Sequence, residues 1–483
     1  MKTLYRKKAI ALYETHMRVG FVVKTVVFYL IAAVLWYIIA VIAPYTATME
    51  VTASQNIVLT RTAFSATEKD INIPIENKER ALLMPTGESS FCRRLRLIED
   101  AKSTIDFMVY FASKSEYSDY FYTALVRAAD RGVKVRIIQD GKMGKLDGYV
   151  ADGIANIIYN HNNIELYYFN CINILDPAGL ATIMHDKVVI VDGDKMIVGG
   201  ANMGTSGYLY NYDMEVLITN SGQHGSVGQA QRYYNNMLKS ELTERIKSKK
   251  RDFSQKSKYE QKYLTFYNKC EFAQKKIDYN ALGVPVDKIT YLTNPISSTK
   301  KTPMILQAMF NMMESSEKSI VITPYSLLEN DKIKKLRALA AKNKQFTLIT
   351  NSLYNSRNVG YADYYYNRDK YINSNIDVYE FQNDIQLHAK VFSFDDRYSV
   401  IGSFNLDERS AHIDTESVVI IDSEEFNKGL QDYIEDTFIA DSLRVSDNNE
   451  YIHSDTVKSH EVSAKKKFTY FLYRALGVVR CLI

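Results

Sequence analysis

Cysteine is scarce in this sequence, and the cysteines present are poorly spaced for a metal site. None belongs to a C-x-x-C pair or to a Cys/His cluster with zinc-finger spacing, so we expect no structural metal. The last cysteine is third from the C-terminus rather than fourth, which excludes a prenylation signal. The four are Cys92, Cys171, Cys270 and Cys481.

The sequence also lacks a strong excess of either charge. Its 60 Lys and Arg residues nearly balance 56 Asp and Glu residues, which gives a formal net charge of +4. This balance does not exclude nucleic acid, but it carries no signal for a polyanion, and we expect no nucleic-acid partner. A hydrophobic content of 46% is typical of a globular chain, and 483 residues exceed what one core usually holds. We therefore expect two similar-sized domains or one two-lobed body.

One long uncharged run, residues 25–43, stands near the N-terminus. Its 19 residues would span roughly 28 Å as a helix, close to the hydrocarbon thickness of a bilayer. Basic residues precede the run and the next one is Arg61, which predicts a cytoplasmic N-terminus and an extracytoplasmic body. The alternative is a signal peptide cleaved near residues 51–53, but the run is long for one, so we favour a single-pass anchor in the cell membrane. The preceding basic residues are Lys2, Arg6, Lys7, Lys8, Arg18 and Lys24.

From residue 89 onward, patterns typical of helices and of apolar strands alternate, which predicts α/β structure with parallel strands. The first half begins with a helix at 89–103, and the second half repeats the same order from a strand at 319–323. The remaining strands of the first half are expected at 104–112, 133–141, 163–170 and within 185–218, and those of the second half at 346–350 and 376–381.

The order of these patterns divides the chain into seven segments. The expected segments are a basic cytoplasmic N-terminus (1–24), a transmembrane anchor (25–43), a tether (44–85), a first lobe (86–228), a Lys-rich helical insertion (229–295), a second lobe (296–445) and a C-terminal tail (446–483). The tail places a basic cluster ahead of aromatic and aliphatic residues. That order is typical of an interfacial membrane helix, and a terminal helix packed on the body is the alternative.

A duplicated motif, H-x-K-x4-D-x6-G-(G/S)-x-N, carries the chemistry of the sequence. The first copy has His185, Lys187, Asp192 and Asn202, and the second has His388, Lys390, Asp395 and Asn405. Two copies with the same Gly and Asn extension are far more specific than one H-x-K-x4-D match.

The spacing of the motif fits phosphodiester chemistry. Alternate residues share one face of a strand, so His185 lies beside Lys187 and His388 beside Lys390. If two lobes pack about a pseudo-twofold axis, both pairs converge on one pocket. One histidine can then attack phosphorus while the other protonates the leaving alcohol and deprotonates the incoming one.

The lysines, with the amides of Asn202 and Asn405, are expected to bind the nonbridging phosphate oxygens. We therefore expect no metal and no cofactor, since the lysines supply the positive charge. A neutral histidine also needs an acceptor that fixes its tautomer. Glu215 and Glu416 follow the two motifs at comparable distances, and we expect them to orient the histidines. Asp192 and Asp395 begin tight turns, so we expect them to support the turn and the catalytic residues.

These motifs resemble the phospholipase D superfamily, and within it bacterial cardiolipin synthases, particularly the C type. The resemblance extends over about residues 89–422. It implies two phospholipase D-like α/β/α sandwich lobes related by pseudo-twofold symmetry. It further implies a phosphatidyl-histidine intermediate, for which we favour the first-copy His185, and transfer to the alcohol of a second phospholipid. The expected partners are the membrane and its phospholipids, phosphatidylglycerol first and phosphatidylethanolamine second.

Three other functions remain open at the level of sequence. A phospholipase D hydrolase would release the same intermediate to water as phosphatidic acid. A phosphodiesterase or nuclease of the superfamily is disfavoured by the duplicated motif and the lack of basic bias. An inactive lipid-binding adaptor is disfavoured because every motif residue is present. The N-terminal anchor and the Lys-rich residues 229–279 depart from the cardiolipin synthase C pattern, so they leave topology and partner choice open.

Overall fold

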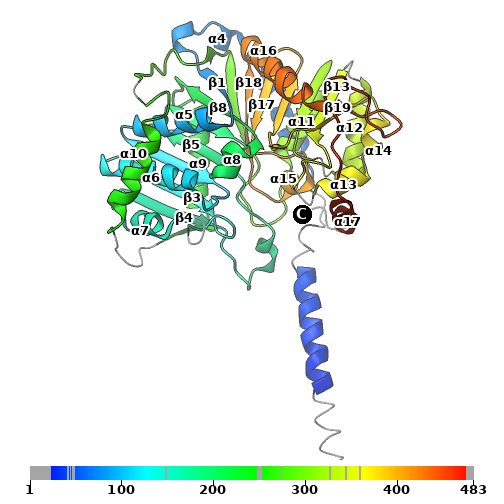
Figure 1. The fold of residues 1–483 in the computed structure, drawn as a ribbon, viewed down its shortest axis with the longest axis horizontal. Coiled ribbons are helices and arrows are strands. Elements are labelled where there is room, and N and C mark those ends of the chain that lie inside the picture. The colour runs from blue at the N-terminus through cyan, green and yellow to red at the C-terminus, as the bar shows by residue number, and fades with distance from the viewer. Residues whose placement is uncertain are drawn as a thin grey trace, which may run out of the picture.

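The computed structural model shows two lobes side by side, with an apolar helix leaving the body on one side (Figure 1). The structure describes residues 23–40, 43, 45, 49–146, 150–246, 253–273, 275–325, 328–342, 345–357 and 360–474. The segments expected at 1–24 and 446–483 are therefore described only in part, and Cys481 lies outside the described residues.

The first lobe is built on a mixed nine-stranded sheet, within the described residues, in the order β10-β1-β8-β6-β5-β2-β3-β4-β9. Strands β2, β3 and β4 are parallel, whereas β5 runs antiparallel to β2. The strands are β1 (Arg80–Pro85), β2 (Thr104–Val109), β3 (Lys134–Asp140), β4 (Ile164–Phe169), β5 (Lys187–Val191), β6 (Lys195–Gly199), β8 (Met214–Thr219), β9 (Thr243–Arg245) and β10 (Val284–Pro285).

The second lobe repeats this sheet almost strand for strand. Its described strands form the order β11-β18-β17-β16-β12-β13-β14-β19, and again only β12, β13 and β14 are parallel. A separate two-stranded sheet of β7 (Asn211–Tyr212) and β15 (Gln386–Leu387) links the lobes. The other strands are β11 (Lys288–Thr293), β12 (Lys318–Ile322), β13 (Gln345–Asn351), β14 (Asp377–Phe381), β16 (Val391–Phe394), β17 (Tyr398–Gly402), β18 (Ser417–Asp422) and β19 (Ser442–Arg444).

Helices pack on both sheets, and some of them lie where the lobes meet (Figure 1). The first lobe carries α5 (Glu88–Glu99), α6 (Glu116–Asp130), α7 (Asp152–Asn160), η2 (Pro177–Leu180), α8 (Thr205–Leu209), α9 (Ser226–Lys239) and α10 (Lys256–Tyr267). The second carries α11 (Met304–Glu314), α12 (Asn330–Lys342), α13 (Tyr361–Tyr366), α14 (Asp369–Ile372), α15 (Glu408–His412), α16 (Glu424–Tyr433), η3 (Ile434–Ile439) and α17 (Ala464–Tyr473).

The two lobes share one apolar core where the sheets meet. Val188 and Val198 of the first sheet belong to the same buried cluster as Val391 and Ile401 of the second. Helix α9 of the first lobe packs on β11 of the second sheet, and α16 packs on β1 of the first. This reciprocal packing confirms the expected pair of α/β lobes related by pseudo-twofold symmetry.

The segment expected to be a tether is structured. Its last residues form β1 inside the first sheet, paired with β8. Its earlier residues form α2 (Ala53–Val58), α3 (Arg61–Phe64), α4 (Glu68–Ile71) and η1 (Ile75–Asn77). Leu59 and Phe64 enter the core of the second lobe, so this part of residues 44–85 belongs to the folded body. The pairing of β1 depends on strands far away in sequence, which local pattern does not reveal.

The segment expected to be a Lys-rich insertion also packs into the first lobe. The boundary at 228/229 falls inside α9, β9 pairs with β4, and Tyr263 and Tyr267 of α10 are buried in the first core. Cys270, just beyond α10, forms a disulfide with Cys92 of α5. Tyrosine supplies large apolar area despite its polar tip, so a segment without an aliphatic run still joins the core.

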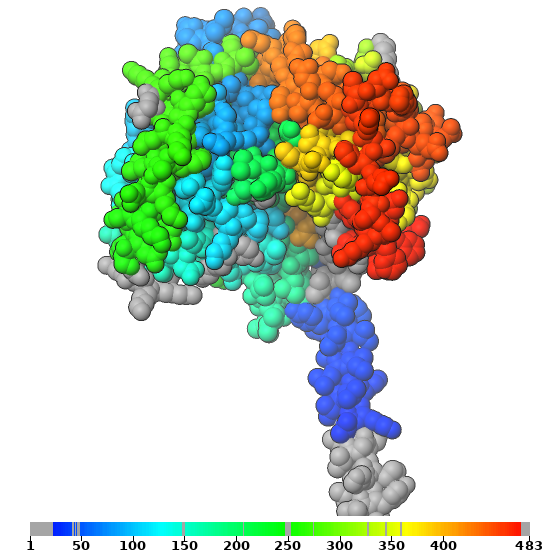
Figure 2. All heavy atoms as spheres, viewed as in Figure 1, coloured from blue at the N-terminus to red at the C-terminus, as the bar shows by residue number. Residues whose placement is uncertain are grey.

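The N-terminal helix Val23–Ala40 stands clear of the body (Figure 2). It has a mean hydropathy of 2.1 and buries none of its length against the described residues. Its length and composition fit a membrane anchor or a signal sequence.

Candidate active site

Both motif histidines lie at the junction of the lobes and are bound by the opposite lobe. The backbone N–H of His185, just before β5, donates to the carbonyl of Thr415 at 3.1 Å. The N–H of His388, just before β16, donates to the carbonyl of Tyr212 at 2.7 Å. Each acceptor follows the other histidine by 27 positions, so the two halves of the junction are equivalent. These two backbone hydrogen bonds hold both histidines at the junction of the lobes.

The histidine side chains are oriented by carboxylates in the same crossed arrangement. Nδ1 of His185 lies 2.8 Å from Oε1 of Glu416, and Nδ1 of His388 lies 2.5 Å from Oδ2 of Asp213. Both carboxylates are buried. When Nδ1–H donates to a carboxylate, Nε2 is left available to act as a nucleophile or to exchange a proton.

Glu215 does not take the orienting role that its place in the sequence suggested. Its carboxylate forms a buried ion pair with Arg94 and accepts a hydrogen bond from Ser90 at 3.4 Å. Equal spacing in the two halves would have identified Asp213 as the orienting residue, because Asp213 and Glu416 each follow a motif histidine by 28 positions. The counterpart of Glu215 at that spacing is Val418, which has no carboxylate.

Each motif lysine folds back over its own histidine. Nζ of Lys187 donates to the carbonyl of His185 at 2.6 Å and lies 5.4 Å from the ring centre of Tyr110. Nζ of Lys390 lies 2.9 Å from Nδ1 and 3.1 Å from Nε2 of His388. The Tyr110 ring also packs on His185, with ring centres 5.2 Å apart. Tyr110 follows β2 and belongs to no motif, so no sequence pattern points to it.

Burial makes the electrostatics of the two histidines unequal. Burial and the Lys187 ammonium lower the pKa of His185 well below its usual value. Burial and Lys390 also lower the pKa of His388, but Asp213 opposes that shift. Burial opposes ionisation of Asp213, yet Lys390 and His388 hold the pKa of Asp213 below its usual value. His388 is therefore the histidine that is supported by an ionised carboxylate.

The carboxylate behind His185 is more weakly ionised. Burial raises the pKa of Glu416 to about 8, while Lys187 and the hydroxyls of Ser403 and Ser410 favour its charged form. Burial also lowers the pKa of Lys187 to about 7 and the pKa of Lys390 to about 8. Both lysines thus sit near the point where they lose charge, and an anionic phosphate between them would favour their charged forms.

The asparagines occupy equivalent positions beyond β6 and β17. Oδ1 of Asn202 and Oδ1 of Asn405 are both buried without a hydrogen-bond partner in the described part of the chain. A buried amide oxygen without a partner is costly unless a donor on a ligand, such as a hydroxyl, satisfies it. Gly200 leaves room for the neighbouring carboxylate, since a Cβ there would lie 2.2 Å from Oδ1 of Asp213. Ser403, in the same place of the second copy, instead donates to Glu416.

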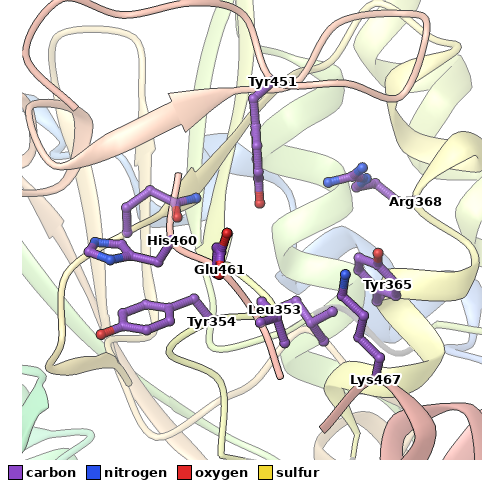
Figure 3. Close-up of a pocket in the computed structure, with 10 residues that line it drawn as sticks. Leu353, Tyr354, Tyr365, Arg368, Tyr451, His460, Glu461 and Lys467 are labelled. Atoms are coloured by element: carbon purple, nitrogen blue, oxygen red, sulfur yellow. The ribbon is translucent and has the colours of Figure 1, made fainter. Parts of the chain in front are cut away.

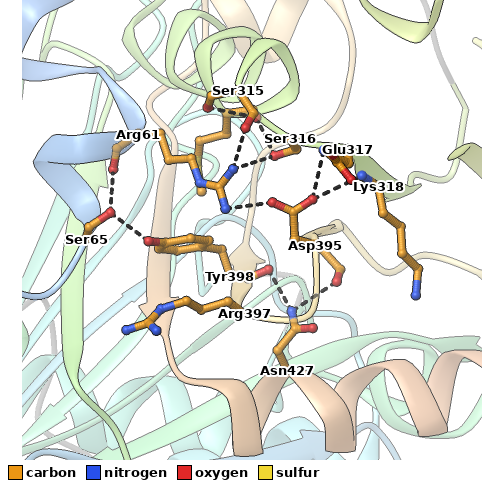
Figure 4. A network of polar contacts seen from close by, with 12 residues as sticks. Arg61, Ser65, Ser315, Ser316, Glu317, Lys318, Asp395, Arg397, Tyr398 and Asn427 are labelled. Atoms are coloured by element: carbon orange, nitrogen blue, oxygen red, sulfur yellow. Dashed lines mark hydrogen bonds and ion pairs between the residues drawn. The ribbon is translucent and has the colours of Figure 1, made fainter. Parts of the chain in front are cut away.

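Asp192 and Asp395 lie at the ends of their strands opposite the lysines. Both adopt a positive φ, 53° and 51°, in the turn that follows. Asp192 accepts hydrogen bonds from the backbone of residues 102–104, and Asp395 from residues 317–318 and from Arg61 at 2.7 Å. Figure 4 shows the second network. These aspartates hold strand ends together and do not contact the histidines.

A separate cavity of about 430 Å³ opens between the second lobe and the C-terminal segment (Figure 3). It is lined by Arg368 and Lys467 together with Glu461 and Tyr451, and it contains no motif residue. Arg368 is already paired with Glu380 at 3.0 Å. We therefore place the chemistry at the junction of the lobes and not in this cavity.

The duplicated lobe and the facing His–Lys pairs define a class of phosphodiester-processing enzymes. The family model described as "Cardiolipin synthase, PLD-like domain" matches residues 95–238 and 309–438, more than half of the chain. The chain belongs to this phospholipase D-like family of phosphatidyltransferases.

The chain is also similar to several known proteins at low identity. The chain is 26% identical to cardiolipin synthase C of Escherichia coli, over 71% of this chain and 81% of that protein. It is also 26% identical to an uncharacterised Helicobacter pylori protein, over 74% of this chain and 78% of that one. Phosphatidylserine synthase of Haemophilus influenzae shares the fold, with a TM-score of 0.62, 14% identity, and coverage of 89% of this chain and 100% of that one.

Proposed function

We propose that the protein is a membrane-bound phosphatidyltransferase of the cardiolipin synthase type. The observation that carries this proposal is the crossed pair, in which His185 and His388 each take a carboxylate from the opposite lobe beside a lysine. Phosphatidylglycerol is the expected donor. The expected acceptor is the head-group alcohol of a second phosphatidylglycerol, and phosphatidylethanolamine, which has no head-group hydroxyl, is the alternative donor.

The reaction proceeds in two balanced displacements. Nε2 of His185 attacks phosphorus, the bond to the head-group oxygen breaks, and His388 gives its proton to the departing alcohol. His388 then removes a proton from the acceptor hydroxyl, whose oxygen attacks phosphorus and breaks the bond to His185. Lys187 and Lys390 stabilise the charge on the nonbridging oxygens in both steps, and the Asn amides complete the pocket.

The assignment of roles follows from the unequal electrostatics. A nucleophile must be unprotonated, and the pKa of His185 is held well below its usual value by burial and Lys187. A general acid must carry a proton, and Asp213, whose own pKa is held below its usual value, makes His388 the more readily protonated of the two histidines, although burial and Lys390 still lower the pKa of His388. The same difference makes His388 the better partner for a leaving alcohol.

The proposed topology is a cytoplasmic N-terminus, a single-pass anchor and an extracytoplasmic body. The disulfide between Cys92 and Cys270 supports this proposal, because structural disulfides persist in oxidising compartments and are rare in the cytosol. Protease added to intact spheroplasts should then digest the body. Protection until the membrane is lysed would place the body in the cytoplasm.

Product analysis tests the proposed activity. Purified full-length protein with phosphatidylglycerol vesicles should form cardiolipin and free glycerol in equal amounts, read by mass spectrometry. The rate should be unchanged by a chelator and abolished in His185→Ala and His388→Ala. Phosphatidic acid as the sole lipid product would identify a hydrolase instead. Activity on DNA without activity on lipid would identify a nuclease.

A further inference from the structure

The loop between β4 and β5 has an exposed apolar tip on a firmly held base. Ile172, Ile174 and Leu175 are 61%, 70% and 89% exposed. Nζ of Lys142 donates to the carbonyls of Gly179 and Thr182, at 2.6 and 2.5 Å, so the base of the loop is fixed. Adjacent exposed aliphatic side chains of this size usually mark a surface that another molecule or a membrane covers.

This loop lies at the catalytic end of the first sheet. It follows the carboxyl end of β4 and leads directly into His185 and β5, and ligands of such sheets bind at the carboxyl ends of the parallel strands. Met143, which is 42% exposed, follows the neighbouring strand β3 at the same end. The apolar tip therefore borders the approach to the histidines.

The N-terminal apolar helix is attached to the base of this same loop. Tyr45 is buried, and its hydroxyl donates to the carbonyl of Ala178 at 2.5 Å and lies 3.3 Å from Oγ1 of Thr182. Nζ of Lys300 donates to the carbonyl of Tyr45 at 3.1 Å. Tyr45 lies five positions after Ala40, where the described apolar stretch Val23–Ala40 ends, so the loop base lies within about 17 Å of that stretch.

Helix α17 presents a second apolar surface on the same side of the body (Figure 1). Its Tyr470 is buried, with its hydroxyl donating to the carbonyl of Ser356 at 3.0 Å. The outward Phe468, Phe471 and Leu472 are 62%, 55% and 54% exposed. Three consecutive lysines, 465 to 467, precede them and would favour an anionic lipid surface.

We propose that the loop at residues 171–176 inserts into the outer part of the bilayer and, with α17, holds the approach to His185 at the lipid surface. The short connection from the apolar helix to the loop base selects a bilayer over a protein partner, because it keeps the loop close to the membrane. In Figure 2 the loop, in green-cyan, ends beside the blue helix. Insertion of the loop does not depend on the proposed function, which explains only why the path to His185 would open toward lipid.

Insertion can be measured without reference to activity. The chain has one tryptophan, Trp36 of the N-terminal helix, so Trp36→Phe gives a silent background for reporters. In that background Leu175→Trp, Ile174→Trp and Phe471→Trp are reconstituted as full-length protein in vesicles of phosphatidylglycerol and phosphatidylcholine. We expect brominated lipid acyl chains to quench all three reporters.

The matched control is Ile71→Trp in α4, which is labelled on the far side of the body from the apolar helix in Figure 1. Ile71 is also an exposed aliphatic residue, at 49%, and its reporter should stay unquenched. The proposal is overturned if, in variants with unchanged melting temperatures, both loop reporters are quenched no more than the control reporter, whether that shared quenching is weak or strong.

A second test uses the reaction. The double variant Ile174→Ser, Leu175→Ser should raise KM for lipid in vesicles on the order of tenfold or more, since two aliphatic side chains no longer enter the bilayer. Its rate on a short-chain monomeric substrate should be unchanged, and Ile71→Ser should alter neither. Equal effects on both substrates would contradict the proposal. If no variant or parent is active on lipid, the proposed function fails while the quenching result still decides the insertion.

Discussion

At the scale of single residues, the site depends on the exchange of carboxylates between the lobes. Asp213 of the first lobe serves His388 of the second, and Glu416 of the second serves His185 of the first. Neither lobe therefore holds both a motif histidine and the carboxylate that orients it. The duplicated motif was sufficient to find the histidines and lysines, but this crossing depends on how the lobes pack.

The crossing predicts different outcomes for two nearby acids. Asp213→Asn should lower kcat by about 10²–10⁴-fold, because His388 loses the charge that favours its protonated form. Glu215→Gln should leave kcat of the folded protein nearly unchanged but lower the free energy of unfolding by about 3–5 kcal/mol, because Arg94 stays buried without its partner. Steady-state kinetics and thermal unfolding of both variants check this. Similar kinetic losses in both would refute the assignment.

The motif lysines predict the alkaline limb of the pH profile. Lys187 and Lys390 have pKa values lowered by burial to about 7 and about 8, so they lose charge as the pH rises through this range. We expect kcat/KM, which reports on the free enzyme, to fall above about pH 7. Lys187→Arg should move this limb up toward the pKa of Lys390, since arginine keeps its charge. An unmoved limb would exclude Lys187 as its cause.

Sequence pattern predicts the place of some site residues but not of others. The sequence placed Asp192 and Asp395 in turns, and both lie in turns with positive φ. It assigned Glu215 by proximity along the chain, although the equal spacing of 28 positions pointed to Asp213. Tyr110 carries no pattern, because its contact with His185 arises only where the end of β2 meets β5.

At the scale of elements, the alternation of helices and strands was readable because each buried strand is a short apolar run. β2 and β3 agree closely with the expected segments. β1 was missed, since its pairing with β8 and β10 joins residues far apart in the chain and the surrounding residues are polar. Helix α10 was read as part of an insertion, because its buried face consists of tyrosines rather than aliphatic residues.

The disulfide gives a prediction at this scale. Cys92 of α5 and Cys270 after α10 are 178 positions apart, and the bond closes this long loop in the unfolded chain. Cys92→Ser should therefore lower the free energy of unfolding by about 2–5 kcal/mol. Cys171→Ser is the matched control, because Cys171 is a free thiol. Thermal unfolding with and without reductant measures both, and equal stability of the two variants would contradict the bond.

At the scale of the whole molecule, duplication and membrane attachment together shape the proposed function. The two lobes bring one His–Lys pair each to a shared junction, and the apolar helix ends near the loop that leads into His185. The two-lobed body could be predicted from the repeated motif. The position of the helix on the body could not, because Tyr45 binds residues that are distant in sequence.

The central claim is a covalent intermediate on His185, with His388 as the proton donor. A phosphatidyl ester with a nitrophenol leaving group needs no proton donor, so His388→Ala should still form the intermediate but release it slowly. We predict a burst of one nitrophenol per protein, and one phosphatidyl group on the peptide that contains His185, found by mass spectrometry after an alkaline quench. No burst should occur in His185→Ala. A phosphatidyl group on His388 of the unsubstituted protein, or no adduct on any histidine, would contradict the account.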